Sequence, residues 1–147
     1  MRFHECIQGV YFDDLDALGI LHNSRYLVLF ERTIGSLWQR LGWSGMPDAQ
    51  LNPDQFHLVR ANHVEYLHPI TGVCEVRVRV WVQQLGKTSL TFGLRVQPLD
   101  EDVDHATGYR VLVCVEPTTR RSVPWSDAFR KRINAYVESA QSVPPSA

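Results

Sequence analysis

The sequence lacks the features that would point to nucleic acid, a membrane or a metal. Its formal net charge over 147 residues is −1, so no basic field would draw the chain to nucleic acid or to an anionic membrane. No stretch approaches the ~18 uninterrupted apolar residues of a membrane-spanning helix, and residues 1–6 lack the apolar run of a signal peptide. The six histidines show no metal-site spacing, and no Walker loop or G-x-S-x-G motif occurs. We therefore expect no metal and no nucleic-acid partner.

Cysteine is also scarce. The chain has three cysteines, Cys6, Cys74 and Cys114, and no C-x-x-C pair. An odd number at wide spacing supports neither a zinc ribbon nor a disulfide scaffold. Because unpaired cysteine often packs as a small hydrophobic residue, we expect buried free thiols in a reducing compartment and interpret the protein as cytoplasmic.

One segment has a clear helical pattern, from Asn23 or Ser24 to about Trp43. Its apolar residues recur at spacings of three and four on one stripe: Phe30, Ile34, Leu37, Trp38 and Leu41. Asn23 and Ser24 are good N-cap residues, and Gly42 stands where helices commonly end. At ~1.5 Å per residue this helix would be roughly 28 Å long. We expect it to be the only long helix.

The rest of the pattern is mostly that of strands. A first strand is expected over residues 3–12 and a second over 56–67. Strict alternation of apolar and polar residues predicts two further strands, over 75–83 and 90–97. A two-residue turn at Gly86-Lys87, with glycine first, would join these two strands.

A last strand is expected over 109–116, through Val111, Val113 and Val115. A short helix should then run from Ser126 to about Ala140, with Phe129, Ile133 and Val137 at spacing four. Consecutive strands with short links imply an antiparallel sheet. We expect one α+β domain over residues 1–141, in which an apolar helix face covers an apolar sheet face, and a flexible Pro- and Ser-rich tail over 142–147.

An acidic loop, residues 13–19, leads directly into the long helix. A helix start carries unpaired backbone N–H groups and a partial positive charge, which can stabilise a developing oxyanion. A carboxylate held across a narrow gap from those donors could activate water or attack a carbonyl itself. The residues alone leave a second interpretation open, in which the acidic run only caps the helix and His22 is a surface or capping group.

The segment from Asp14 to Tyr26, DLDALGILHNSRY, followed by Phe30-Glu31-Arg32, resembles the D-x-D-x-x-G signature of hotdog-fold acyl-CoA thioesterases. The likeness is to the 4-hydroxybenzoyl-CoA thioesterase-like family. Tyr66-Leu67-His68-Pro69 is similar to the family's Y-L-R-P, and Leu85 to Ser89 is similar to its hairpin. Together with the order of elements, the likeness covers nearly the whole chain.

The resemblance implies a hotdog fold, an antiparallel five-stranded sheet wrapped on one long central helix with a short C-terminal helix. It also implies an enzyme that hydrolyses the thioester bond of acyl-CoA, with coenzyme A entering as part of the substrate and no other cofactor. Members of the family form homodimers and homotetramers. Two rival functions stay open: a hotdog domain that only binds an acyl group or a partner protein, and a thioesterase that acts on carrier-protein thioesters.

The resemblance further assigns roles to single residues. Asp16 matches the family's nucleophile or general base, and His22 and Asn23 match the helix start whose N–H groups polarise the carbonyl. Tyr26 matches an aromatic with a structural role. Lys87 lies on the hairpin that meets the CoA phosphates in some relatives. This chain departs from the pattern at Ile20, where many relatives have histidine, and at His68, where arginine is commoner.

Overall fold

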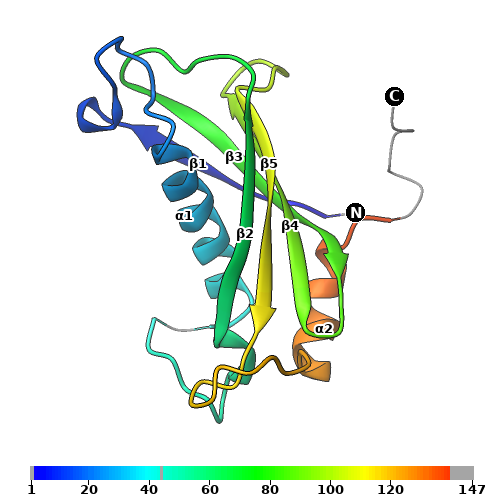
Figure 1. Ribbon diagram of the computed structural model, residues 1–147. Coiled ribbons are helices and arrows are strands. Elements are labelled where there is room, and N and C mark those ends of the chain that lie inside the picture. The colour runs from blue at the N-terminus through cyan, green and yellow to red at the C-terminus, as the bar shows by residue number, and fades with distance from the viewer. Residues whose placement is uncertain (1, 44, 140–147) are drawn as a thin grey trace.

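The computed structural model describes residues 2–43 and 45–139. Five strands form one antiparallel sheet in the order β1-β3-β4-β5-β2 (Figure 1). The elements are β1 (His4–Val10), η1 (Phe12–Asp14), α1 (Arg25–Arg40), η2 (Pro53–Gln55), β2 (His57–Tyr66), β3 (Cys74–Leu85), β4 (Ser89–Pro98), β5 (Ala106–Cys114), α2 (Asp127–Ile133) and η3 (Asn134–Tyr136). The predicted antiparallel five-stranded sheet and the short C-terminal helix are confirmed.

The central strands bury one face, as their alternation predicts. The inward residues of β3 and β4 are at most 1% exposed: Val76, Val78, Val80, Val82, Leu90, Phe92, Leu94 and Val96. They lie in register across the sheet, with Val78 opposite Val96 and Val80 opposite Leu94. Because side chains of period two share a face, this pairing makes a continuous apolar surface on which a helix can pack.

Helix α1 covers part of that surface and contacts β1 and β3 (Figure 1). Its buried stripe is Tyr26, Leu29, Phe30, Thr33, Ile34 and Leu37. It has 16 residues, so the predicted helix from Asn23 or Ser24 to about Trp43 was too long at both ends. Ser24 makes no side-chain cap, and the chain leaves the helix through Gly42 at φ 94°, a conformation that favours glycine.

In strand β5 the residues that face the core are not the valines that the sequence pattern indicates. Val111 and Val113 are half-buried, whereas Leu112 and Cys114 belong to the core. Arg110 shares their face and is 4% exposed. Its guanidinium is satisfied there by Glu31 of α1 and by Asn62 of β2, whose Oδ1 accepts from Arg110 Nε at 2.8 Å. A cation paired through long-range contacts can occupy a position that its residue type alone would place outside.

Two other boundaries differ from the sequence predictions. The β3–β4 turn is centred on Lys87 and Thr88, not on Gly86-Lys87, because the Gly86 N–H donates to the Ser89 carbonyl at 2.8 Å. Helix α2 ends at Ile133, well before Ala140. Its predicted start is confirmed, since the Ser126 hydroxyl caps the helix by accepting from the N–H of Phe129.

The two ends of the sheet carry different loops (Figure 1). At one end the acidic loop before α1 meets the β2–β3 connection. Leu21 N–H donates to Ile70 O at 2.8 Å, and Gly72 N–H donates to Gly19 O at 2.9 Å. The opposite end carries the β3–β4 turn and α2. The acidic loop is therefore fixed against the sheet by backbone hydrogen bonds.

Three further predictions concern the chain as a whole. The three cysteines are free, but only Cys114 is fully buried. No helix in the described residues is long and apolar enough to cross a membrane. The tail predicted for residues 142–147 lies outside the described residues, and the domain boundary at 141 stays a prediction.

Candidate active site

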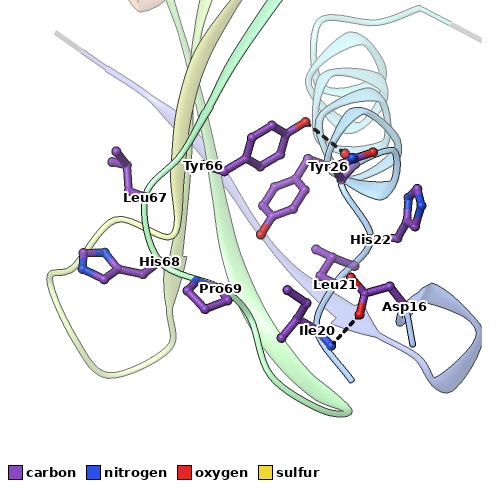
Figure 2. A pocket seen from close by; sticks show the side chains of 10 residues that line it. Asp16, Ile20, Leu21, His22, Tyr26, Tyr66, Leu67, His68 and Pro69 are labelled. Atoms are coloured by element: carbon purple, nitrogen blue, oxygen red, sulfur yellow. Dashed lines mark hydrogen bonds between the residues drawn. The ribbon is translucent and has the colours of Figure 1, made fainter. Parts of the chain in front are cut away.

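A pocket of about 500 Å³ opens between the acidic loop, the start of α1 and the end of β2 (Figure 2). Its lining residues are Asp16, Ile20, Leu21, His22, Asn23, Tyr26, Tyr66, Leu67, His68 and Pro69. Leu21 and Tyr26 are 4% and 3% exposed and form its floor, whereas Tyr66 and Leu67 are about half exposed and form its rim. The sequence predictions for Asp16, His22 and Asn23 thus fall on one pocket.

Asp16 both shapes the loop and faces the pocket. Its Oδ1 accepts the N–H of Leu18 at 2.8 Å and of Ile20 at 3.3 Å. Its own N–H donates to the carbonyl of Ile20 at 2.8 Å, so the loop closes on this residue. Among the described residues Oδ2 accepts no hydrogen bond. One carboxylate oxygen therefore holds the side chain in place, and the other is available to a ligand.

His22 uses its polar groups locally. Its backbone N–H donates to the carbonyl of Asp14 at 2.9 Å. Its Nδ1 accepts the N–H of Ser24 at 3.1 Å and lies 2.8 Å from the Ser24 hydroxyl. This ring therefore caps the exposed start of α1, in agreement with the capping interpretation that the sequence left open.

Unlike His22, Asn23 has a backbone N–H group that donates no hydrogen bond within the described chain. It lies just before the regular part of α1, where the helix leaves N–H groups unpaired and the partial positive charge is greatest. An oxygen with developing negative charge could be stabilised there.

Two tyrosines complete the pocket wall. The Tyr66 hydroxyl donates to the carbonyl oxygen of Asn23 at 3.2 Å, so β2 holds the helix start. Its ring meets the Tyr26 ring edge-on, with centroids 5.0 Å apart. Burial, and secondarily the neighbouring Tyr66, raises the pKa of Tyr26 to about 12, so its hydroxyl stays protonated at neutral pH.

Lys87 does not lie at this pocket within one chain. It belongs to the turn at the far end of β3, and that strand begins at Cys74, beside the acidic loop. A strand of 12 residues spans roughly 36 Å at ~3.3 Å per residue. Within one chain Lys87 is therefore far from Asp16.

Sequence reasoning missed some of the pocket walls. It noted that Tyr66 to Pro69 are similar to the family's Y-L-R-P but did not assign them to the site, and it gave Tyr26 a structural role. The signal that could have found Tyr26 is its place in the first turn of α1, on the side that also carries the buried Phe30. In the described part of the chain, no three His, Cys, Asp or Glu side chains are grouped so that they could hold a metal ion.

Comparison with known families settles the relationship of this chain. The model of the thioesterase-like superfamily matches residues 10–133. The chain belongs to this superfamily. The predicted family and enzyme class, a thioester hydrolase, are thereby confirmed, and the antiparallel sheet with few helices is consistent with the hotdog fold. A search of curated proteins found no similar sequence.

Several solved structures have a fold similar to that of this chain. A thioesterase from Thermus thermophilus, solved with coenzyme A and Zn, is 32% identical, with TM-score 0.76 over 90% of this chain and 92% of that one. A 1,4-dihydroxy-2-naphthoyl-CoA thioesterase from Synechocystis is 13% identical, with TM-score 0.78 over 90% and 96%. A protein from Staphylococcus aureus in complex with CoA is 16% identical, with TM-score 0.80 over 99% and 89%. The last two show the fold alone.

Proposed function

We propose that this protein hydrolyses acyl-CoA thioesters to the free acid and CoA, with Asp16 as the reacting carboxylate. The observation that carries the proposal is the position of Asp16, anchored through Oδ1 and open at Oδ2 in a pocket that also contains the start of α1. A carboxylate fixed by its own loop keeps one geometry at little entropic cost, which favours reaction with a bound carbonyl.

Two routes fit this geometry. As general base, Asp16 Oδ2 takes a proton from water while the hydroxide forms a bond to the thioester carbon. As nucleophile, Oδ2 bonds to that carbon directly, and water later cleaves the acyl-enzyme anhydride. In both routes the C–S bond breaks and the CoA thiolate leaves, to be protonated by solvent.

The oxyanion donor in this proposal is the N–H of Asn23. The N–H of His22, which the family resemblance also suggests, already donates to Asp14. Removing such a donor typically costs ~10²–10³ in turnover. A backbone N–H cannot be removed by mutation of its side chain, so its role is tested through the groups that position it, above all Tyr66.

We also propose that the protein is a homo-oligomer that pairs through β2. This strand lies at a sheet edge, and nearly all its residues are exposed, Leu58 and Val59 to about half. An open edge with exposed apolar residues favours pairing with another strand. Antiparallel pairing of two β2 strands would bring one subunit's β3–β4 turn to the end of the sheet where its partner carries Asp16. Lys87 would then contact the CoA phosphates of the partner's substrate.

A coenzyme A thioester is favoured over a carrier-protein thioester because the 32% identical Thermus thermophilus thioesterase was solved with coenzyme A. A cytoplasmic location belongs to the same proposal, since acyl-CoA is an intracellular metabolite and the three cysteines are free. No metal or redox group takes part in either route.

The experiment is release of free thiol from a panel of acyl-CoAs, followed with a thiol-reactive dye, and from the same acyl groups on a carrier protein. Turnover of acyl-CoA, at a higher kcat/KM than the carrier-bound form, is the expected result. Faster turnover on the carrier would make that protein the substrate. Thermal stabilisation by CoA with no turnover of any thioester would instead support a domain that only binds acyl groups.

A further inference from the structure

Asp14 joins three segments that carry or border the candidate site. Its Oδ2 accepts the N–H of Tyr11 at 2.8 Å, and its own N–H donates to the Tyr11 carbonyl at 3.0 Å. Its carbonyl accepts the N–H of His22 at 2.9 Å. Its Oδ1 lies 3.6 Å from Nε of Arg25, the first residue of α1. Asp14 thus connects the chain after β1, the acidic loop and the start of α1.

These contacts distinguish Asp14 from an ordinary surface acid. Its side chain is 15% exposed, whereas Asp13, its neighbour in η1, is exposed. An ion pair between two exposed side chains contributes little, because the ordering of both long side chains opposes it. The Asp14 carboxylate is already held by the Tyr11 N–H, so the contact with Arg25 orders only one further side chain. Asp14 is therefore placed to fix the position of the helix start.

Only part of the usual stabilisation is present at the start of α1. The His22 ring accepts the N–H of Ser24, but the first turn contains no acidic residue and Ser24 makes no side-chain cap. Helix α2 has both, with Ser126 as cap and Asp127 in its first turn. The first turn of α1 contains Arg25 instead. A cation there is unfavourable for the helix, but it preserves the positive potential that an oxyanion needs.

We propose that Asp14 is a positioning residue of the proposed reaction, which fixes the separation between the Asp16 carboxylate and the N–H group of Asn23. The inference rests on the proposed function and adds a residue to it. Asp16 follows Asp14 by two positions, and Asn23 follows His22, whose N–H donates to Asp14. A change in the contacts of Asp14 therefore moves the two reacting groups relative to each other. Asp14 does not line the pocket, so it acts through these groups and not on the substrate.

The test separates the two contacts of the Asp14 carboxylate. In Asp14→Asn the amide oxygen can still accept the Tyr11 N–H, but the ion pair with Arg25 is lost. Arg25→Met removes the same ion pair from the helix. Each variant should lower kcat roughly 3- to 10-fold with KM little changed, because a small displacement of the reacting groups reduces turnover without loss of binding. Asp14→Ala loses both contacts and should lower kcat roughly 10- to 100-fold.

A double variant and a conservative replacement make the result specific. Because Asp14 and Arg25 act through one contact, Asp14→Asn combined with Arg25→Met should lower kcat no further than either single variant. Arg25→Lys retains a cation and should recover most of the native kcat. Multiplied effects in the double variant would overturn the inference, as would a kcat for Arg25→Lys no higher than that for Arg25→Met.

Glu5→Gln is the matched control, because it removes another partly exposed ion pair, that of Glu5 with Arg79, outside the pocket. It should retain native kcat whatever its loss of stability in urea. An equal fall of kcat in Glu5→Gln and Asp14→Asn, or a native kcat in Asp14→Asn, would overturn the inference. If Asp14→Ala does not fold, the other variants decide. Each of these results leaves the proposed function standing, since that function fails only if Asp16→Asn retains full turnover.

Discussion

The Tyr66 hydroxyl donates to the carbonyl oxygen of Asn23 at 3.2 Å, and this bond joins the end of β2 to the start of α1 across 43 positions of sequence. This bond also affects the N–H group of Asn23. The carbonyl belongs to the peptide group that follows Asn23, so the bond restrains the backbone of Asn23, and we expect it to limit the movement of the preceding N–H group at the pocket. The oxyanion donor of the proposed reaction thus depends on a side chain from another element.

Tyr66→Phe tests that dependence. Loss of one hydrogen bond is worth about 1 kcal/mol, so kcat should fall roughly 3- to 10-fold, with a smaller change in KM. Steady-state kinetics with the best acyl-CoA of the panel gives both numbers. Tyr109→Phe, on β5 outside the pocket, is the matched control and should retain native kcat. An unchanged kcat in Tyr66→Phe would mean that the helix start needs no such support.

The structural role of Asp16 can be separated from its chemical role. Asp16→Ala loses both bonds that Oδ1 accepts, from Leu18 and Ile20, and should lower the free energy of unfolding by about 1–3 kcal/mol. Asp16→Asn retains an amide oxygen that can accept the same two bonds, so it should lose much less. Urea unfolding of the two variants measures the difference. Equal stability of both would show that these loop bonds contribute little.

The half-buried His57 predicts how stability depends on pH. Burial lowers the pKa of His57 below its ordinary value of 6.5, against the weaker opposing effects of the Asp54 carbonyl and Glu31. The unfolded chain therefore binds a proton at higher pH than the folded one, and the stability present above 6.5 is lost as the pH falls below it. The free energy of unfolding should decrease between about pH 7.5 and about pH 5.

His57→Phe isolates this contribution, because a phenyl ring can take the same place beside Trp38 and Trp43 without a charge. Its urea unfolding should vary less with pH than that of the native protein over the same interval. An identical slope in the two proteins would assign the acid sensitivity to other groups. His4, whose pKa is also lowered by burial and secondarily by Arg40, is the next to replace in that case.

The proposed β2 interface makes a prediction about assembly. Val59→Lys places a charge on the exposed edge strand β2 and should shift the protein towards monomer in sedimentation equilibrium, since a lysine at an edge opposes strand pairing. Ile7→Lys makes the same change on β1, the other edge of the sheet, and should leave the assembly intact. A native protein that sediments as a monomer would refute the interface, as would dissociation by Ile7→Lys alone.

Local pattern was sufficient to predict most of the fold. The alternation in β3 and β4 and the stripe of α1 follow from burial of one face, which a short stretch of sequence records. In β5 the same reasoning selected Val111 and Val113, whereas the core takes Leu112 and Cys114. The choice depends on Arg110, whose burial requires Glu31 and Asn62 from other elements. No local pattern contains those contacts.

The same limit applies to the site. Asp16 could be predicted because its loop and the following helix are contiguous in the sequence. Three other features of the site depend on how the described chain folds back on itself. The His22 N–H already donates to Asp14, Tyr66 supports Asn23, and the hydroxyl of Tyr26 is open to the pocket. Lys87 could not be placed in the same way. The hairpin motif that contains it gave no information on its distance from Asp16.

The most direct test of the account is kcat for Asp16→Asn with the best acyl-CoA substrate, beside Asp13→Asn as an exposed acid of the same loop. The amide preserves the loop but can neither accept a proton from water nor attack the thioester. We predict that kcat falls by about 10²–10⁴ with KM little changed, while Asp13→Asn retains native kcat. A kcat for Asp16→Asn within about threefold of the native value would contradict the role of Asp16.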